Sequence, residues 1–89
     1  MAMIVVTTFE LADGVTAEAF AEADARYQQD VAYQQPGLKR RTTAVDTEAP
    51  GVWCVVETWA GEGSPVAWDV GDLGPMVAKV DRRTYETLD

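Results

Sequence analysis

The side chains best suited to acid–base chemistry lie on a valine-rich segment that contains Glu57 between Trp53 and Trp59. In an extended strand these three side chains share one face, because alternate residues point the same way. A carboxyl group buried beside indole rings is poorly hydrated, and its pKa rises toward that of a working general base. Glu57 is therefore a candidate catalytic base. The alternative is an ion pair with Arg40 or Arg41 on a neighbouring strand, which would hold the strands in register.

Four other side chains are candidates for binding a small molecule. The guanidinium group of Arg41 suits an anionic or enolate ligand, although pairing with carboxylates is the alternative in an acidic protein. Tyr27 lies on the apolar stripe of a predicted helix, so its ring fills core while its hydroxyl seeks a partner. Trp68 projects away from the stripe of its own helix. It contacts a ligand or a partner subunit, or a bend in the helix packs it inward as a lid. Trp59 belongs either to the core or to the wall of the ligand site.

The amino-acid counts exclude several familiar reaction types. The chain of 89 residues has no histidine and one cysteine, Cys54. It therefore cannot form a Ser-His-Asp or Cys-His catalytic system, a zinc site of the usual Cys/His kind, an internal disulfide or a histidine-bound haem. The formal net charge of −8 argues against non-specific nucleic-acid binding, which depends on an excess of lysine and arginine. We expect no cofactor and no metal.

Length and hydrophobicity favour one folded unit. With 47% hydrophobic residues the chain is too apolar to be disordered, and residues 1–89 are too few for two cores. The first residues lack the features of a secretion signal, and the longest apolar stretch is too short to cross a membrane. We expect a single domain in the cytoplasm that does not bind membranes.

Periodicity and turn residues predict four strands and two helices in the order βαββαβ. Thr16 is the expected N-cap of the first helix, and glycines and a proline interrupt the second. The predicted strands are Met3 to Leu11, Leu38 to Val45, Val52 to Ala60 and Arg82 to Leu88, and the helices extend from Thr16 to about Tyr33 and from Ser64 through Val80. This order is that of a ferredoxin-like α+β fold, with a four-stranded antiparallel sheet and both helices on one face.

The second and third strands are predicted to form an antiparallel hairpin. A short polar loop joins them and ends in Pro50-Gly51. Proline followed by glycine suits the two central positions of a type II turn.

The predicted sheet carries apolar residues on both of its faces. In the first strand Val5 and Phe9 point one way while Ile4 and Val6 point the other, and the third strand alternates in the same manner. Two helices can cover only one of these faces. A second copy of the sheet, related by a two-fold axis, would cover the other, and we predict a homodimer. The alternative is a partly exposed second face, since natural surfaces contain much apolar area.

Short motifs at two places resemble the dimeric α/β-barrel superfamily. Gln35-Pro36-Gly37 precedes the second strand, and Glu57-Thr58-Trp59 ends the third, where a Glu-x-Trp ending is common in the antibiotic-biosynthesis-monooxygenase branch. The resemblance implies a homodimer with a ligand cleft between each subunit's sheet and helices. It also implies cofactor-independent oxygenation of an aromatic or polyketide-like substrate. Members often carry a histidine at the position of Trp68, so a mechanism that uses that histidine is not available here.

Three functions remain open on these observations. The first is a cofactor-independent monooxygenase that acts on an aromatic metabolite. The second is a non-catalytic ligand-binding or accessory dimer of the same fold, which the missing histidine favours. The third is a structural interaction domain whose cleft is filled by its own side chains. The three tryptophans in so short a chain indicate an apolar pocket and favour the first two.

Overall fold

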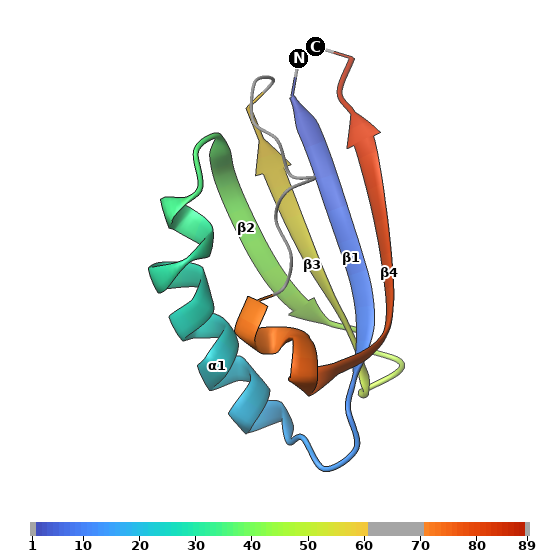
Figure 1. The fold of residues 1–89 in the computed structure, drawn as a ribbon. Coiled ribbons are helices and arrows are strands. Elements are labelled where there is room, and N and C mark those ends of the chain that lie inside the picture. The colour runs from blue at the N-terminus through green and yellow to red at the C-terminus, as the bar shows by residue number, and fades with distance from the viewer. Residues whose placement is uncertain (1, 61–70, 89) are drawn as a thin grey trace.

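A computed structural model describes residues 2–60 and 71–88 of the chain. In it, a four-stranded antiparallel sheet packs against one long helix (Figure 1). Residues 64–70 of the predicted second helix, including Trp68, lie outside the described residues. The next six residues, Gly71–Met76, form a short 3-10 helix, η3, that contains Pro75.

The sheet has the strand order β2-β3-β1-β4, and every neighbouring pair is antiparallel. The four strands are β1 (Met3–Leu11), β2 (Leu38–Val45), β3 (Val52–Trp59) and β4 (Val77–Glu86). Valine and threonine are frequent in these segments, as the preference of β-branched residues for strands requires. The sheet and its helix confirm the predicted ferredoxin-like α+β fold.

Helix α1 (Ala17–Asp30) begins as predicted, because the Thr16 hydroxyl accepts a hydrogen bond from the Ala19 backbone N–H at 3.1 Å. The helix ends earlier than the predicted Tyr33. The β-branched Val31 adopts φ −123° and ψ −58°, outside the helical range, and the chain continues as a 3-10 helix, η1 (Ala32–Gln34). Among the described residues, no helix has the length and apolar character needed to cross a membrane.

The last strand begins earlier than the sequence predicted. Val77 and Val80 keep helical spacing with the preceding valines, and this spacing predicts that they belong to the second helix. In the structure both belong to β4, which begins where Val77 pairs with Leu11 of β1. Gly74 and Pro75 stop a helix just before this point, and β-branched valines then favour the extended chain.

The loop between β2 and β3 contains the predicted turn but not the predicted turn type. The Val52 N–H donates to the Ala49 carbonyl oxygen at 2.8 Å, which places Pro50 and Gly51 at the two central positions. A type II turn needs a positive φ at the second of these residues, and Gly51 does not have one. The prediction of type II was therefore wrong. Among the described glycines, positive φ values occur instead at Gly14 and Gly37, in the turns on either side of α1.

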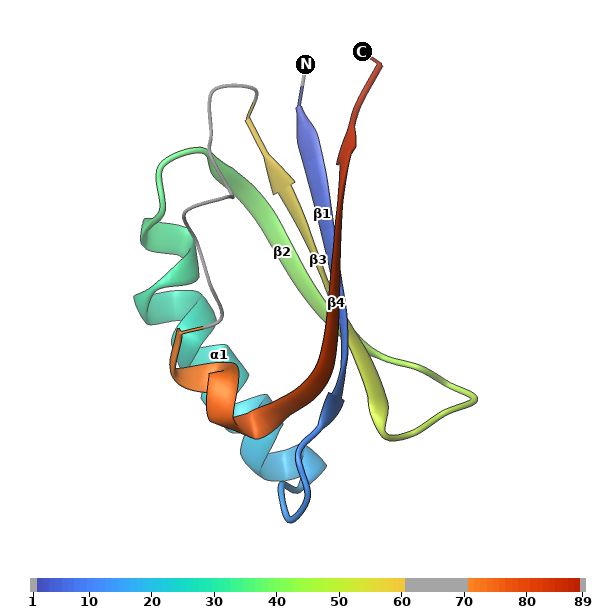
Figure 2. The ribbon, with the colours of Figure 1, turned by 45° about the vertical axis from the view of Figure 1, so that its right-hand side comes forward.

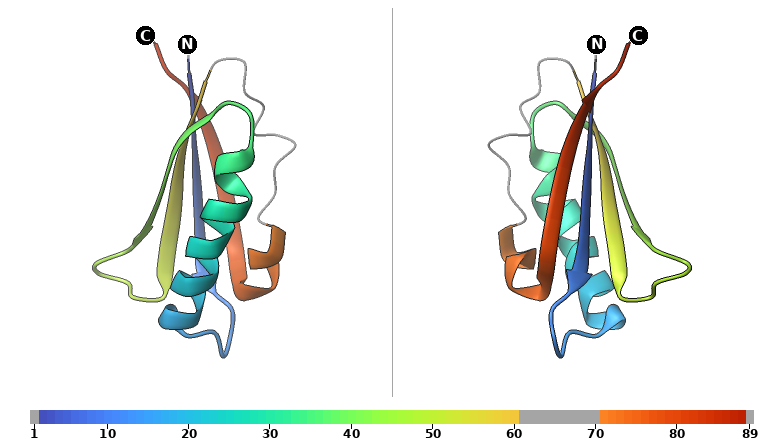
Figure 3. Two further views of the ribbon diagram at one scale, coloured as in Figure 1. Left: turned by 90° about the vertical axis from the view of Figure 1, so that its left-hand side faces the viewer. Right: turned by 90° about the vertical axis from the view of Figure 1, so that its right-hand side faces the viewer.

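The two faces of the sheet differ sharply in their surroundings. The helices lie on one face, as the turned views show (Figures 2 and 3). Residues pointing toward α1 are buried and form the core with Phe20 and Tyr27 of the helix: Val5, Phe9, Trp53, Val55 and Trp59. Residues on the opposite, outer face are only partly buried in the single chain, and they include Ile4, Val6, Val52, Cys54 and Val56. The predicted two apolar faces are confirmed.

We expect Trp59→Ala to lower the free energy of unfolding by about 3–5 kcal/mol, because this ring is only 1% exposed within the core. Denaturant titration at a fixed protein concentration measures the change. Leu88→Ala is the matched control, since that side chain is fully exposed and its loss should change stability by less than about 0.5 kcal/mol. An equally small effect of Trp59→Ala would show that the ring is not part of the core.

Candidate functional site

A fully buried carboxyl group lies at the centre of the helix-facing side of the sheet. Glu57 of β3 is 0% exposed and pairs across the sheet with Val5 of β1 and Arg41 of β2. Neither of its carboxyl oxygens has a hydrogen-bond partner, and the same is true of the indole nitrogens of Trp53 and Trp59. Buried polar atoms are nearly always paired, so this concentration of unpaired ones distinguishes the region as a candidate site.

Two arginines approach Glu57 from the two edge strands. Arg41 Nε lies 3.9 Å from Glu57 Oε2, and Arg82 Nη2 of β4 lies 3.9 Å from Glu57 Oε1. Both distances allow electrostatic attraction but exceed the range of a hydrogen bond. Of the two partners that the sequence allowed, the structure places Arg41 beside the carboxyl group. Arg40 pairs with Thr58 on the outer face of the sheet and is exposed.

The environment of Glu57 favours the protonated form. Burial raises the pKa of this carboxyl group above its ordinary value of 4.5. The Arg41 guanidinium, Arg82 and the nearby Trp59 indole N–H, which points toward the carboxyl group without reaching hydrogen-bond geometry, lower the pKa, but their combined effect is smaller than that of burial. A carboxyl group with a raised pKa is a stronger proton acceptor than an exposed one, as general-base chemistry requires.

Arg41 is held by a polar network that connects the sheet to α1. Its Nη2 donates to Asp24 Oδ1 at 2.8 Å, and its Nη1 donates to Gln28 Oε1 at 3.1 Å and to Thr43 Oγ1 at 3.2 Å. Its Cζ lies 5.4 Å from the centroid of the Tyr27 ring, within the range of a cation–π contact. Arg41 is thus part of the interior, with a side chain only 1% exposed.

The backbone at Arg41 is held by Tyr33, which the sequence analysis did not identify. The Tyr33 hydroxyl accepts a hydrogen bond from the Arg41 N–H at 2.9 Å and donates one to its carbonyl oxygen at 3.3 Å. Tyr33 lies in η1, beyond the end of α1, and its ring is 43% exposed. No spacing rule for a continuous helix would have indicated this contact, since it depends on where the helix ends.

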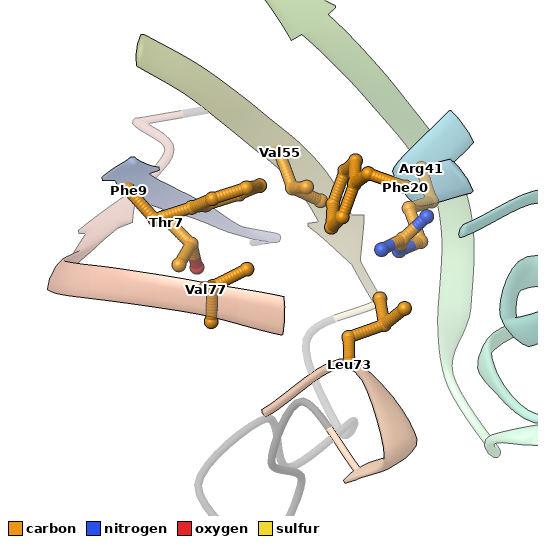
Figure 4. A pocket seen from close by; sticks show the side chains of 7 residues that line it. All are labelled: Thr7, Phe9, Phe20, Arg41, Val55, Leu73 and Val77. Atoms are coloured by element: carbon orange, nitrogen blue, oxygen red, sulfur yellow. The ribbon is translucent and has the colours of Figure 1, made fainter. Parts of the chain in front are cut away.

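A narrow cavity borders this cluster between the sheet, α1 and η3. Figure 4 shows the side chains that line it: Thr7, Phe9, Phe20, Arg41, Val55, Leu73 and Val77. Its free volume is about 10 Å³, enough for about one water molecule. The lining is apolar except for Thr7 and Arg41, and Val55 is two residues from Glu57 on the same face of β3.

The structure brings together four of the five site residues that the sequence indicated. Glu57, Trp59 and Arg41 are neighbours on the sheet, and Tyr27 joins them through its contact with Arg41. The fifth, Trp68, lies outside the described residues.

Asp24 and Thr43 belong to the same cluster and were missed, whereas Arg82 is one of the basic residues whose guanidinium groups the sequence suggested for an anionic ligand. Asp24 had a readable signal, because Phe20, Asp24 and Tyr27 follow helical spacing and are the buried residues of α1. Within residues 2–60 and 71–88, no group of three or more acidic, cysteine or histidine side chains is placed to hold a metal ion.

The pKa of Glu57 has a consequence for stability that a substitution can reveal. Because the pKa is raised in the folded state, this group stabilises the protein most fully below pH 4.5, and the contribution is lost as the pH rises through the folded pKa. We expect Glu57→Gln, which does not titrate, to gain stability relative to the wild type as the pH rises above 4.5.

Denaturant titrations of both proteins at a series of pH values measure this difference. Glu22→Gln, at an exposed site on α1, should show almost no such trend. A difference that decreases with pH would show that the two arginines outweigh burial.

No family model matches the sequence, and no curated protein matches it. Solved structures do match its fold over nearly the whole chain. One is a "putative antibiotic biosynthesis monooxygenase" from Nitrosomonas europaea, with a TM-score of 0.77, 14% identity and coverage of 98% of this chain and 90% of that one.

Two further matches have similar coverage. A dimeric ferredoxin-like protein of unknown function from Thermobifida fusca has a TM-score of 0.73 at 22% identity, covering 98% of this chain and 92% of that one. A mutant of SnoaB, a cofactor-independent oxygenase from Streptomyces nogalater, has a TM-score of 0.72 at 19% identity, covering 99% and 94%. The resemblance indicated by the sequence is thus confirmed at the level of fold: this chain has the ferredoxin-like α+β fold of antibiotic-biosynthesis-monooxygenase-like structures.

Proposed function

We propose that the protein is a homodimer that binds an aromatic or polyketide-like small molecule between α1 and the sheet and oxygenates it without a cofactor. The observation that carries this proposal is Glu57, which is fully buried, has no hydrogen-bond partner and lies between two guanidinium groups. In this role Glu57 is the base. The fold shared with a cofactor-independent oxygenase supports the proposal.

The proposed reaction balances with dioxygen as the oxidant. In an anthrone-type substrate, Glu57 takes a proton from the activated CH₂ carbon and leaves an electron-rich carbanion. The carbanion reduces dioxygen in one-electron steps, and a C–O bond forms to give a peroxide anion, which takes the proton back from Glu57 to become a hydroperoxide. Loss of water then breaks the remaining C–H bond at this carbon and the O–O bond, and leaves a carbonyl group. One oxygen atom enters the product and the other enters water, so no further reductant is needed.

The neighbours of Glu57 have complementary roles in this proposal. Arg41 and Arg82 stabilise the enolate that forms when the proton leaves, since their positive charges already face the carboxyl group. Trp59 and Tyr27 supply aromatic surface beside the substrate, and Trp68 is a further candidate from the sequence. An aromatic ring is far larger than this narrow cavity, so side chains that line it have to move apart when the substrate enters.

We expect the wild-type protein to consume oxygen with an anthrone or quinol probe, and Glu57→Gln to reduce the rate by about 100-fold or more because the proton acceptor is lost. An oxygen electrode measures both rates. Glu22→Gln is the matched control, since it makes the same chemical change at a side chain that is 73% exposed, and it should keep the wild-type rate. An unchanged rate in Glu57→Gln would remove Glu57 as the base.

A non-catalytic ligand-binding or accessory dimer is the second candidate. It is favoured by the distances of 3.9 Å from both arginines to Glu57, which also suit a purely structural charge cluster. Quenching of tryptophan fluorescence by the same probes separates the two functions. Binding without oxygen uptake by the wild type would favour the second candidate.

The homodimer is supported by the outer face of the sheet. On this face Val6 of β1 pairs with Val56 of β3, while Ile4 lies opposite Thr58, and no described helix covers this side of the sheet. The matching Thermobifida fusca protein is described as dimeric. Two such faces packed together would remove the apolar side chains of β1 and β3 from water, while Arg83 of β4 and Arg40 of β2 lie to either side of them.

We expect the wild type to sediment at twice the chain mass of 9.7 kDa, and Val56→Asp to sediment as a monomer. The substitution places a charge at the centre of the proposed interface, directly opposite Val6. Ala19→Asp adds the same charge at an exposed position of α1 and should leave the dimer intact. A wild-type protein that is monomeric at micromolar concentration would contradict the proposed interface.

A further inference from the structure

Asp24 is a buried carboxylate on a helix whose other acidic side chains are exposed. It is 6% exposed, whereas Glu18, Glu22 and Asp30 of α1 face solvent. Both of its oxygens have short hydrogen bonds. Oδ1 accepts from Arg41 Nη2 at 2.8 Å, and Oδ2 accepts from the Thr43 hydroxyl at 2.6 Å. Removing a carboxylate from water costs free energy, which its ion pair and hydrogen bonds have to offset. For Asp24 the partners that do so are Arg41 and Thr43.

Arg41 therefore lies between two carboxyl groups and is bound to only one of them. The distance from Nη2 to Asp24 is that of a charge-assisted hydrogen bond, whereas the distance from Nε to Glu57 is 3.9 Å. The contact of Nη1 with Gln28 also draws the guanidinium toward the helix, while its contact with Thr43 ties it to β2. Nε is buried and has no hydrogen-bond partner.

We propose that Asp24 is a positioning residue for the base: it draws the Arg41 guanidinium toward α1 and so prevents it from forming a hydrogen-bonded ion pair with Glu57. This inference rests on the proposed function, in which Glu57 accepts a proton from the substrate. A carboxylate joined to arginine by two short hydrogen bonds has its lone pairs occupied and is a weak base. At 3.9 Å the guanidinium still attracts the charge of Glu57, but it leaves both oxygens open to a proton.

The groups that face Glu57 come from every element packed against it. Arg41 approaches from β2 and Arg82 from β4, while the Trp59 indole comes from its own strand. Val5, its neighbour on β1, carries no charge. From α1, Asp24 acts through Arg41, and the Tyr27 ring lies against the same guanidinium. Asp24 is therefore the carboxylate that competes with Glu57 for a shared cation.

Asp24→Asn tests this competition, because the amide has nearly the same shape but no charge. Freed from its stronger partner, the Arg41 charge then acts on Glu57, and we expect the midpoint of Glu57 protonation to move to lower pH. Carbon-detected NMR of protein labelled at the glutamate carboxyl carbons measures this midpoint, and the signal is assigned by its loss in Glu57→Gln. Glu22→Gln removes a charge from the same helix at an exposed position and should leave the midpoint unchanged.

A second variant keeps the test decisive if Asp24→Asn does not fold. Thr43→Val keeps the charge of Asp24 but removes one of its two hydrogen bonds and one contact of Arg41, so a smaller shift in the same direction is expected. A midpoint that is unchanged or higher in Asp24→Asn would overturn the proposal. That result is expected if Asp24 only anchors Arg41, because the substitution would then release the guanidinium and take its charge away from Glu57. Should Asp24→Asn not fold, the same result in Thr43→Val would overturn it.

The titration needs no substrate, so its result is independent of the proposed function. If the wild type takes up no oxygen, the oxygenase proposal fails, while the NMR midpoints still decide whether Asp24 controls the protonation of Glu57. Where oxygen uptake is observed, the acid limb of the pH–rate profile of Asp24→Asn should move to lower pH together with the midpoint. An acid limb that stays in place while the midpoint moves would overturn the link between Asp24 and the base.

Discussion

The burial of Glu57 at the centre of the sheet is the constraint on which the surrounding arrangement depends. A charged carboxyl group removed from water loses hydration worth at least several kcal/mol, so it has to be neutralised or surrounded by opposite charge. The structure does both in part: burial favours the protonated form, and two arginines favour the charged form. These arginines come from the two edge strands, so both edges of the sheet must be in register with β3.

The register of β2 against β3 is fixed at Arg41, the residue that pairs with Glu57. A slip by one residue would send Arg41 to the outer face and bring its neighbour to Glu57. Tyr33 binds the backbone of Arg41 on the side away from β3, and Asp24 of α1 binds its guanidinium group. The two Tyr33 hydrogen bonds also satisfy backbone groups of an edge strand that would otherwise be open to pairing with another chain. Tyr33 thus protects the edge of the sheet at the residue whose side chain Asp24 holds.

The comparison with solved structures separates fold from chemistry. Agreement of fold over nearly the whole chain at 14% to 22% identity means that most individual side chains can differ without changing the fold. Function depends on particular side chains placed on that scaffold. Here the buried carboxyl group, the two arginines and Asp24 form a cluster whose charges balance one another.

The sequence by itself determined the order of the elements, the capping of α1 by Thr16 and the two apolar faces of the sheet, because these follow from local periodicity and turn chemistry. It also indicated Glu57 and Arg41, since strand alternation places them on definable faces. Only the tertiary structure decided that Arg41 rather than Arg40 lies beside Glu57, and that Asp24 shares it. Those outcomes depend on strand register and on which helix crosses the sheet, which are long-range choices that local spacing does not encode. The valines of β4 show the same limit, because their spacing suits a helix and a strand alike and only pairing with β1 selects the strand.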